Sequence, residues 1–179
     1  MVGLSEPYAA EVLASNIHEK ITVSEYIVLA TERFRDANYQ LAEEYFKKAV
    51  NVSRSNLHPS GQVSNFQQHI ALKALAVFYF QNQPLRSYEK AKDNFAQAVE
   101  LLESGSDPNS FLRLGETYEI WGLNSLYNQF TQDGNGQIEK AKRYYSQLPP
   151  PQSPYDPISQ QLIENLDKKI EAIKKNLNP

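Results

Sequence analysis

The sequence predicts an all-α fold built from helix hairpins that stack side by side. Nearly every long segment has helical periodicity, and no segment shows the alternating pattern of a β-strand. One pattern of small and aromatic residues occurs three times, anchored on Ala42, Ala91 and Ala141, which are 49 and 50 residues apart. Recurrence at a fixed spacing of this size indicates stacked helical units that bury their apolar faces against one another.

Each copy of the pattern forms the second helix of a predicted hairpin. The three copies read Tyr39, Ala42, Phe46, Ala49; then Tyr88, Ala91, Phe95, Ala98; then Ile138, Ala141, Tyr145, Leu148. Steps of three and four residues place all four positions of a copy on one helix face. We therefore expect alternating small and large side chains to lie against the first helix of each hairpin.

Eight helices are expected along the chain, with start signals before several of them. Their approximate ranges are 5–19, 23–36, 39–54, 61–82, 86–103, 108–130, 137–147 and 157–177. Thr22 and Glu25 form a capping box, and Ser64 with Gln67 is a second candidate. Asp107-Pro108 and Asp156-Pro157 each place an N-cap acid before a proline that suits the first helical position.

The domain prediction is a single unit over residues 1–179. An N-terminal helix precedes hairpins at about 23–54, 61–103 and 108–148, and a last helix at about 157–177 closes the row. That last helix carries an apolar stripe of Ile158, Leu162, Leu166, Ile170, Ile173 and Leu177. We expect the stripe to cap the open end of the stack. The alternative is a coiled-coil seam in a homodimer, although the stripe barely reaches three heptads.

Composition narrows the class of protein. The 179 residues carry a formal net charge of −3, which gives no basic field for nucleic acid. There is no cysteine, so thiolate chemistry, thiolate metal sites and disulfides are excluded. The apolar run 74–80 is too short to span a bilayer, and the first residues lack a signal-peptide pattern. We expect a cytoplasmic protein with no membrane span.

No motif in the sequence indicates catalysis or a cofactor. Residues 131–142 resemble a calcium-binding EF-hand loop, but Thr131 and Lys142 stand where the first and last carboxylate ligands belong. We expect a glycine-rich turn there. His18, His58 and His69 do not share a metal-ligand spacing, so surface or packing roles are expected. Nucleophile elbows, zinc-protease helices and dinucleotide fingerprints are missing, which favours a non-catalytic protein.

The first helices of the hairpins carry a family resemblance. The segment 111–118, Phe-Leu-Arg-Leu-Gly-Glu-Thr-Tyr, resembles the tetratricopeptide repeat (TPR) signature. Leu72, Leu75, Ala76 and Tyr79 repeat its spacing, as do Tyr26, Leu29 and Ala30. The intervals from Ala30, Ala76 and Gly115 to the paired alanines are 12, 15 and 26 residues, so this is an irregular, long-period version. The resemblance implies a right-handed superhelix of about three hairpins.

The resemblance also implies a concave groove lined by the first helices. The corresponding positions are Ser24, Ile27, Thr31, Phe34, Arg35, Ile70, Lys73, Val77, Phe80, Gln81, Asn109, Leu112, Glu116, Glu119 and Ile120. Ile27 and Thr31 occupy places where chaperone-binding relatives use charged or amide side chains, so a clamp for a terminal carboxylate is disfavoured.

The function expected from the resemblance is a protein-interaction module, an adaptor, scaffold or assembly factor. It would bind a peptide or helix of a partner in the groove. The alternative is a regulatory sensor whose stack responds to a small ligand, a signal peptide or calcium, with the loop 131–142 as its only specific support.

Overall fold

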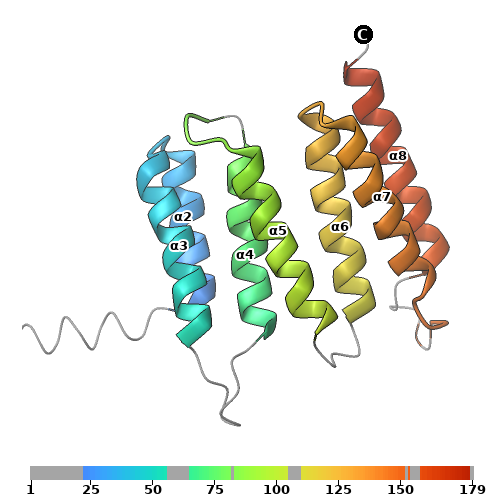
Figure 1. Cartoon of the computed structure of the whole chain (residues 1–179), viewed down its shortest axis with the longest axis horizontal. Helices are drawn as coiled ribbons and strands as arrows, with labels where there is room; N and C mark the ends of the chain where they lie inside the picture. Colours follow the sequence, from blue (N-terminus) through green and yellow to red (C-terminus); the bar gives the residue numbers. More distant parts are fainter. Residues whose placement is uncertain are drawn as a thin grey trace, which may run out of the picture.

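The helices stand in one row, as successive antiparallel pairs (Figure 1). The computed structural model describes residues 22–55, 65–81, 83–104, 110–151, 153 and 158–177, which contain seven α-helices and no strand. The helices are α2 (Val23–Arg35), α3 (Tyr39–Ser55), α4 (Asn65–Phe80), α5 (Tyr88–Glu103), α6 (Ser110–Tyr127), α7 (Thr131–Ser146) and α8 (Ser159–Leu177). The all-α prediction is confirmed. The expected helix at 5–19 and three expected caps, at residues 64, 107 and 156, lie outside the described residues.

Contacts between hairpins involve the first helix of each pair. Helices α2, α4, α6 and α8 contact one another in succession, and each second helix contacts the first helix that follows it. The second helices of neighbouring hairpins also contact one another, through long side chains. The Lys90 ammonium of α5 lies 3.6 Å from the Glu43 carboxylate of α3, and the Tyr144 hydroxyl of α7 donates to the Glu103 carboxylate of α5 at 2.8 Å. The successive contacts among α2, α4, α6 and α8 place these first helices along one face of the row, and this face positions the candidate site.

Small residues bring the two helices of a hairpin close together. The anchor residues Ala42, Ala91 and Ala141 are all 0% exposed. In the third hairpin, a Cβ on Gly115 would lie 2.5 Å from the Tyr145 ring, so only glycine fits against this buried side chain. This is the tight pairing of a small residue with a large one that the repeated pattern predicts.

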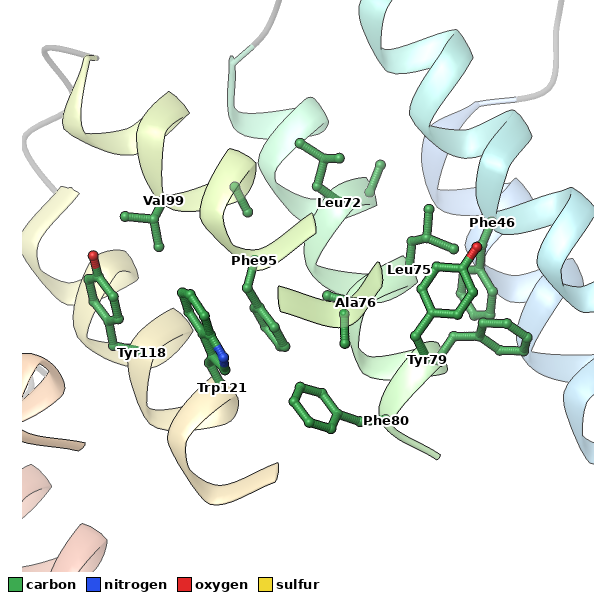
Figure 2. Close-up of a cluster of buried hydrophobic side chains, with 14 of the residues drawn as sticks. Phe46, Leu72, Leu75, Ala76, Tyr79, Phe80, Phe95, Val99, Tyr118 and Trp121 are labelled. Carbon is green, nitrogen blue, oxygen red and sulfur yellow. The ribbon is translucent and has the colours of Figure 1, made fainter. Parts of the chain in front are cut away.

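Aromatic side chains fill the space between hairpins (Figure 2). The rings of Phe95 and Trp121 stack with centroids 5.5 Å apart, which joins α5 to α6. Within the second hairpin, the Phe80 ring of α4 lies 6.0 Å from the Phe95 ring of α5, so it extends this aromatic cluster. Phe46 and Phe78 meet at 5.4 Å between α3 and α4. Such pairs contribute roughly 0.5–1.5 kcal/mol each beyond the apolar area that they bury.

The predicted turn before the last helix of the third hairpin is wrong. Helix α7 begins at Thr131 and not near 137, so the segment that resembles a calcium loop is helical. A Cβ on Gly134 would lie 2.8 Å from Leu126, which shows that this glycine allows α6 and α7 to approach closely. Asp133 accepts a hydrogen bond from Ser125 of α6 at 3.2 Å. Packing against α6 thus outweighs the turn propensity of the two glycines.

The two ends of the described row are built as the sequence indicates. Thr22 and Glu25 form the predicted capping box at the start of α2. At the other end, Leu166 is 0% and Ile170 8% exposed where α8 packs against α6 and α7. The centre of the apolar stripe is therefore used within the chain and is not available as a dimer seam. None of the helices in the described segments is long and apolar enough to cross a membrane.

Candidate groove on the first-helix face

An open groove of about 400 Å³ lies on the face formed by the first helices. Helices α2 and α4 supply most of its walls, α3 contributes Phe46, and α6 closes one side with Ile120. The structure brings together eight of the residues predicted for a groove: Ile27, Thr31, Phe34, Ile70, Lys73, Val77, Gln81 and Ile120. Their binding role stays a prediction.

The walls are apolar because the sequence spaces its apolar residues by helical turns. Ile27, Thr31 and Phe34 are four and three residues apart, so they share one face of α2. The Thr31 hydroxyl donates to the Ile27 carbonyl at 2.8 Å, which leaves its methyl group for the groove. Phe34 is held edge-on by Tyr39 at 5.5 Å and by Phe78 at 6.1 Å. Phe34 is therefore a positioned wall, which suits the binding of apolar side chains.

Lys73 is the cation in this apolar lining. It is half-buried on α4, and burial lowers the pKa of its ammonium below the ordinary value. The Glu116 carboxylate opposes that shift and the Arg113 guanidinium reinforces it. Among the described residues, no acceptor forms a hydrogen bond or an ion pair with the Lys73 ammonium.

Four of the predicted residues lie elsewhere than in this groove. Phe80 is 3% exposed and packs inside the second hairpin against Tyr88 and against Phe95 (Figure 2 shows Phe80 and Phe95), so it does not line this groove. Leu112 and Glu116 lie on α6 beyond the groove wall, and Arg35 is exposed near the end of α2.

Ser24 and Asn109 are two more of the predicted groove positions. Ser24 lines a shallow hollow on α2 together with Val28, outside the groove. Asn109 lies outside the described residues. Three residues that line the groove were not predicted: Phe46, Ala74 and Phe78. Ala74 and Phe78 continue the helical spacing of Ile70 on α4, and that spacing could have found them.

Glu119 is also absent from the groove, because it connects three helices at the other end of the row. Its carboxylate accepts a hydrogen bond from the Tyr145 hydroxyl of α7 at 2.6 Å. It also pairs with the Lys169 ammonium of α8 at 2.6 Å. Burial, the hydrogen bond to Glu119 and its negative charge all raise the pKa of Tyr145 above the ordinary range. Glu119 therefore has a structural role, because it connects α6 to α7 and α8.

A buried histidine joins the second hairpin to the third. His69 is 1% exposed, and its Nε2 lies 2.9 Å from the Thr117 hydroxyl. That hydroxyl donates to the Arg113 carbonyl at 2.7 Å, so it must accept its other hydrogen bond from His69 Nε2–H. The Nδ1 atom is then a bare acceptor with no hydrogen-bond partner among the described residues. Burial, with the charges of Lys73 and Arg113, lowers the pKa of His69 to about 4.

The same described segments offer no cluster of metal ligands. They contain no group of three or more His, Cys, Asp or Glu side chains that could hold a metal ion. The resemblance of residues 131–142 to a calcium loop also loses its structural basis, since α7 starts at Thr131.

Comparison with protein-family models, with curated proteins and with solved structures gives no significant match.

Proposed function

We propose that the chain is a non-catalytic interaction module, which binds a peptide or helix of a partner protein in the groove on the first-helix face. The observation that carries the proposal is the open, largely apolar groove of about 400 Å³ between α2, α4 and α6. A groove of this size accommodates a few side chains of a segment laid across it. Helix-in-groove recognition uses such apolar anchors at successive helical turns.

Two further features support the proposal. The first helices α4, α6 and α8 each contact both helices of the preceding hairpin, as expected of a repeat stack whose first helices share one face. The repeated pattern resembles the TPR family, whose members use this face to bind other proteins. A right-handed superhelix with α8 as its cap, and a cytoplasmic site of action, belong to the same proposal.

The test compares an aspartate inside the groove with an aspartate outside it. Val77→Asp places a charge on the groove wall, whereas Val28→Asp places one on a side chain that is already 57% exposed on another face of α2. Both proteins, and the wild type, serve as bait for affinity purification from the native source, read by mass spectrometry. We expect partners that are retained by Val28→Asp and lost by Val77→Asp.

A second variant separates loss of binding from loss of folding. Ala74→Phe fills the groove with an apolar ring and introduces no charge. Circular dichroism and thermal melting establish that each variant is folded before binding is measured. If the folded Val77→Asp and Ala74→Phe proteins retain every partner of the wild type, the groove is not the binding surface and the proposal is wrong.

A further inference from the structure

Lys73 differs from the other half-buried cations among the described residues. Lys142 of α7 pairs with Asp167 of α8 at 2.7 Å, and Arg33 pairs with Asp36 at 3.2 Å. Arg113 lies over the Phe66 ring, 3.9 Å from its centroid. Lys73 has no hydrogen bond or ion pair of this kind in the described part of the chain, although it lies in a largely apolar groove wall.

An unpaired ammonium in an apolar wall is unfavourable. Partial burial removes water from the charge, and no fixed acceptor replaces that water. The Glu116 carboxylate attracts the ammonium, but among the described residues no ion pair joins the two. A ligand that covers the groove would remove still more water from the ammonium. Such a ligand binds well only if it brings an acceptor of its own to this position.

A single ammonium group can form an ion pair with a single carboxylate, and this pairing neutralises both charges. A phosphate group is bound best by several donors or by an arginine fork, and no arginine lines the groove. The Thr31 hydroxyl already donates within its own helix, which leaves Gln81 as the other polar side chain of the lining that has hydrogen atoms to donate. The remaining walls require apolar groups.

We propose that the groove selects a partner segment in which an aspartate or glutamate side chain lies among apolar anchors, so that its carboxylate pairs with Lys73. This inference rests on the proposed function and specifies the chemistry of the partner. Large apolar side chains of the partner segment would fill the space beside Phe34, Val77 and Ile120. The carboxylate gives specificity, because a segment without it leaves the ammonium covered and unpaired.

The test uses a display library of random 12-residue peptides fused at both ends, so that a terminal carboxylate contributes nothing. The full chain is the target, and the folded Ala74→Phe variant removes peptides that bind outside the groove. Peptides that depend on the groove are synthesised with blocked ends. Each Asp or Glu is then replaced in turn by Asn or Gln, and affinities are measured by fluorescence anisotropy at two salt concentrations.

We expect one acidic residue per peptide to matter, with its amide variant binding about tenfold more weakly to the wild type. On Lys73→Met the acidic peptide and its amide variant bind with equal affinity. Lys168→Met, an exposed lysine on α8, keeps the full difference as the matched control. Glu116→Gln strengthens binding of the acidic peptide, since it removes a like charge beside the carboxylate.

Two results contradict the inference and differ from each other. Peptides that depend on the groove but bind equally well as acids and as amides would overturn the acidic partner alone and leave the proposed function standing. A library that yields no peptide sensitive to Ala74→Phe would overturn the proposed function, and the acidic partner with it.

Discussion

Two crevices on the same row of first helices differ in one respect: the chain fills one of them and leaves the other open. Between α6 and α8 the chain fills the crevice itself, with Leu166 and Ile170 as apolar contacts and Lys169 paired to Glu119. Between α2 and α4 the crevice is open, and Lys73 has no counter-charge at ion-pair distance among the described residues. At the α8 end of the row, the charge and the apolar surface are both matched within the chain. At the α2 end, the described residues leave the groove open and the Lys73 charge without an ion-pair partner.

The difference separates a surface that stabilises the fold from the surface that we propose binds a partner. A charge at a crevice that is closed within the chain is compensated by a partner on the next helix. A charge at an open crevice keeps part of its desolvation cost until something else supplies the partner. Open, imperfectly satisfied surfaces are where interaction sites are usually found. The following predictions test this contrast, from the largest expected effect to the smallest.

The filled crevice depends most on Leu166. We expect Leu166→Ala to lower the free energy of unfolding by about 3 kcal/mol, because it removes a fully buried side chain and leaves a cavity beneath α8. Leu177→Ala, at a side chain that is 39% exposed, is the control and should cost less than about 1 kcal/mol. Urea unfolding measures both. Equal costs would show that α8 does not close the row.

Gly115 supports the same end of the row through Tyr145. Gly115→Ala should lower the free energy of unfolding by about 2 kcal/mol, since its Cβ would lie 2.5 Å from a ring whose hydroxyl is bound to Glu119. Gly136→Ala places a Cβ in open space on α7 and should raise stability by about 0.5–1 kcal/mol. Thermal melting compares the two. Stabilisation by both alanines would mean that the ring moves aside freely.

The two lysines should respond oppositely to loss of their charge. Lys169→Met removes the ion-pair partner of Glu119 and should cost about 1 kcal/mol, a modest value because the Lys169 side chain is 57% exposed. Lys73→Met should be neutral or stabilise by about 0.5–1 kcal/mol, since an unpaired and partly desolvated charge becomes apolar. Urea melts at neutral pH give the signs. Clear destabilisation by Lys73→Met would reveal a partner within the chain.

His69 connects α4 to α6, the helices between the two crevices, and its protonation should change the stability of the fold only in acid. Its pKa is about 4 in the folded chain and near 6.5 when unfolded, so the unfolded state binds more protons between these values. Stability should therefore be complete above about pH 6.5 and fall as the pH drops toward 4. His69→Gln keeps the donor to Thr117 and removes the titration, so its stability should fall less over that interval. Parallel acid losses in both proteins would contradict this role.

The sequence by itself determined the helices and their inner faces. The spacing of Ala42, Phe46 and Ala49 fixes which side of α3 turns inward, because helical geometry depends only on local periodicity. The capping box at Thr22 is equally local, since its atoms are three residues apart. Eight of the residues that line the groove were named through the TPR resemblance, which implies that these positions on the first helices share one face.

Only the tertiary structure decided which neighbour each face meets. Phe80 and Glu119 lie on predicted first helices, but the positions of α5, α7 and α8 turn them into core and ion-pair residues. The helical start of α7 at Thr131 likewise depends on Gly134 packing against Leu126. Periodicity orients a side chain about its own helix axis. The distance to the next helix arises from contacts between residues far apart in the chain, and no local pattern encodes it.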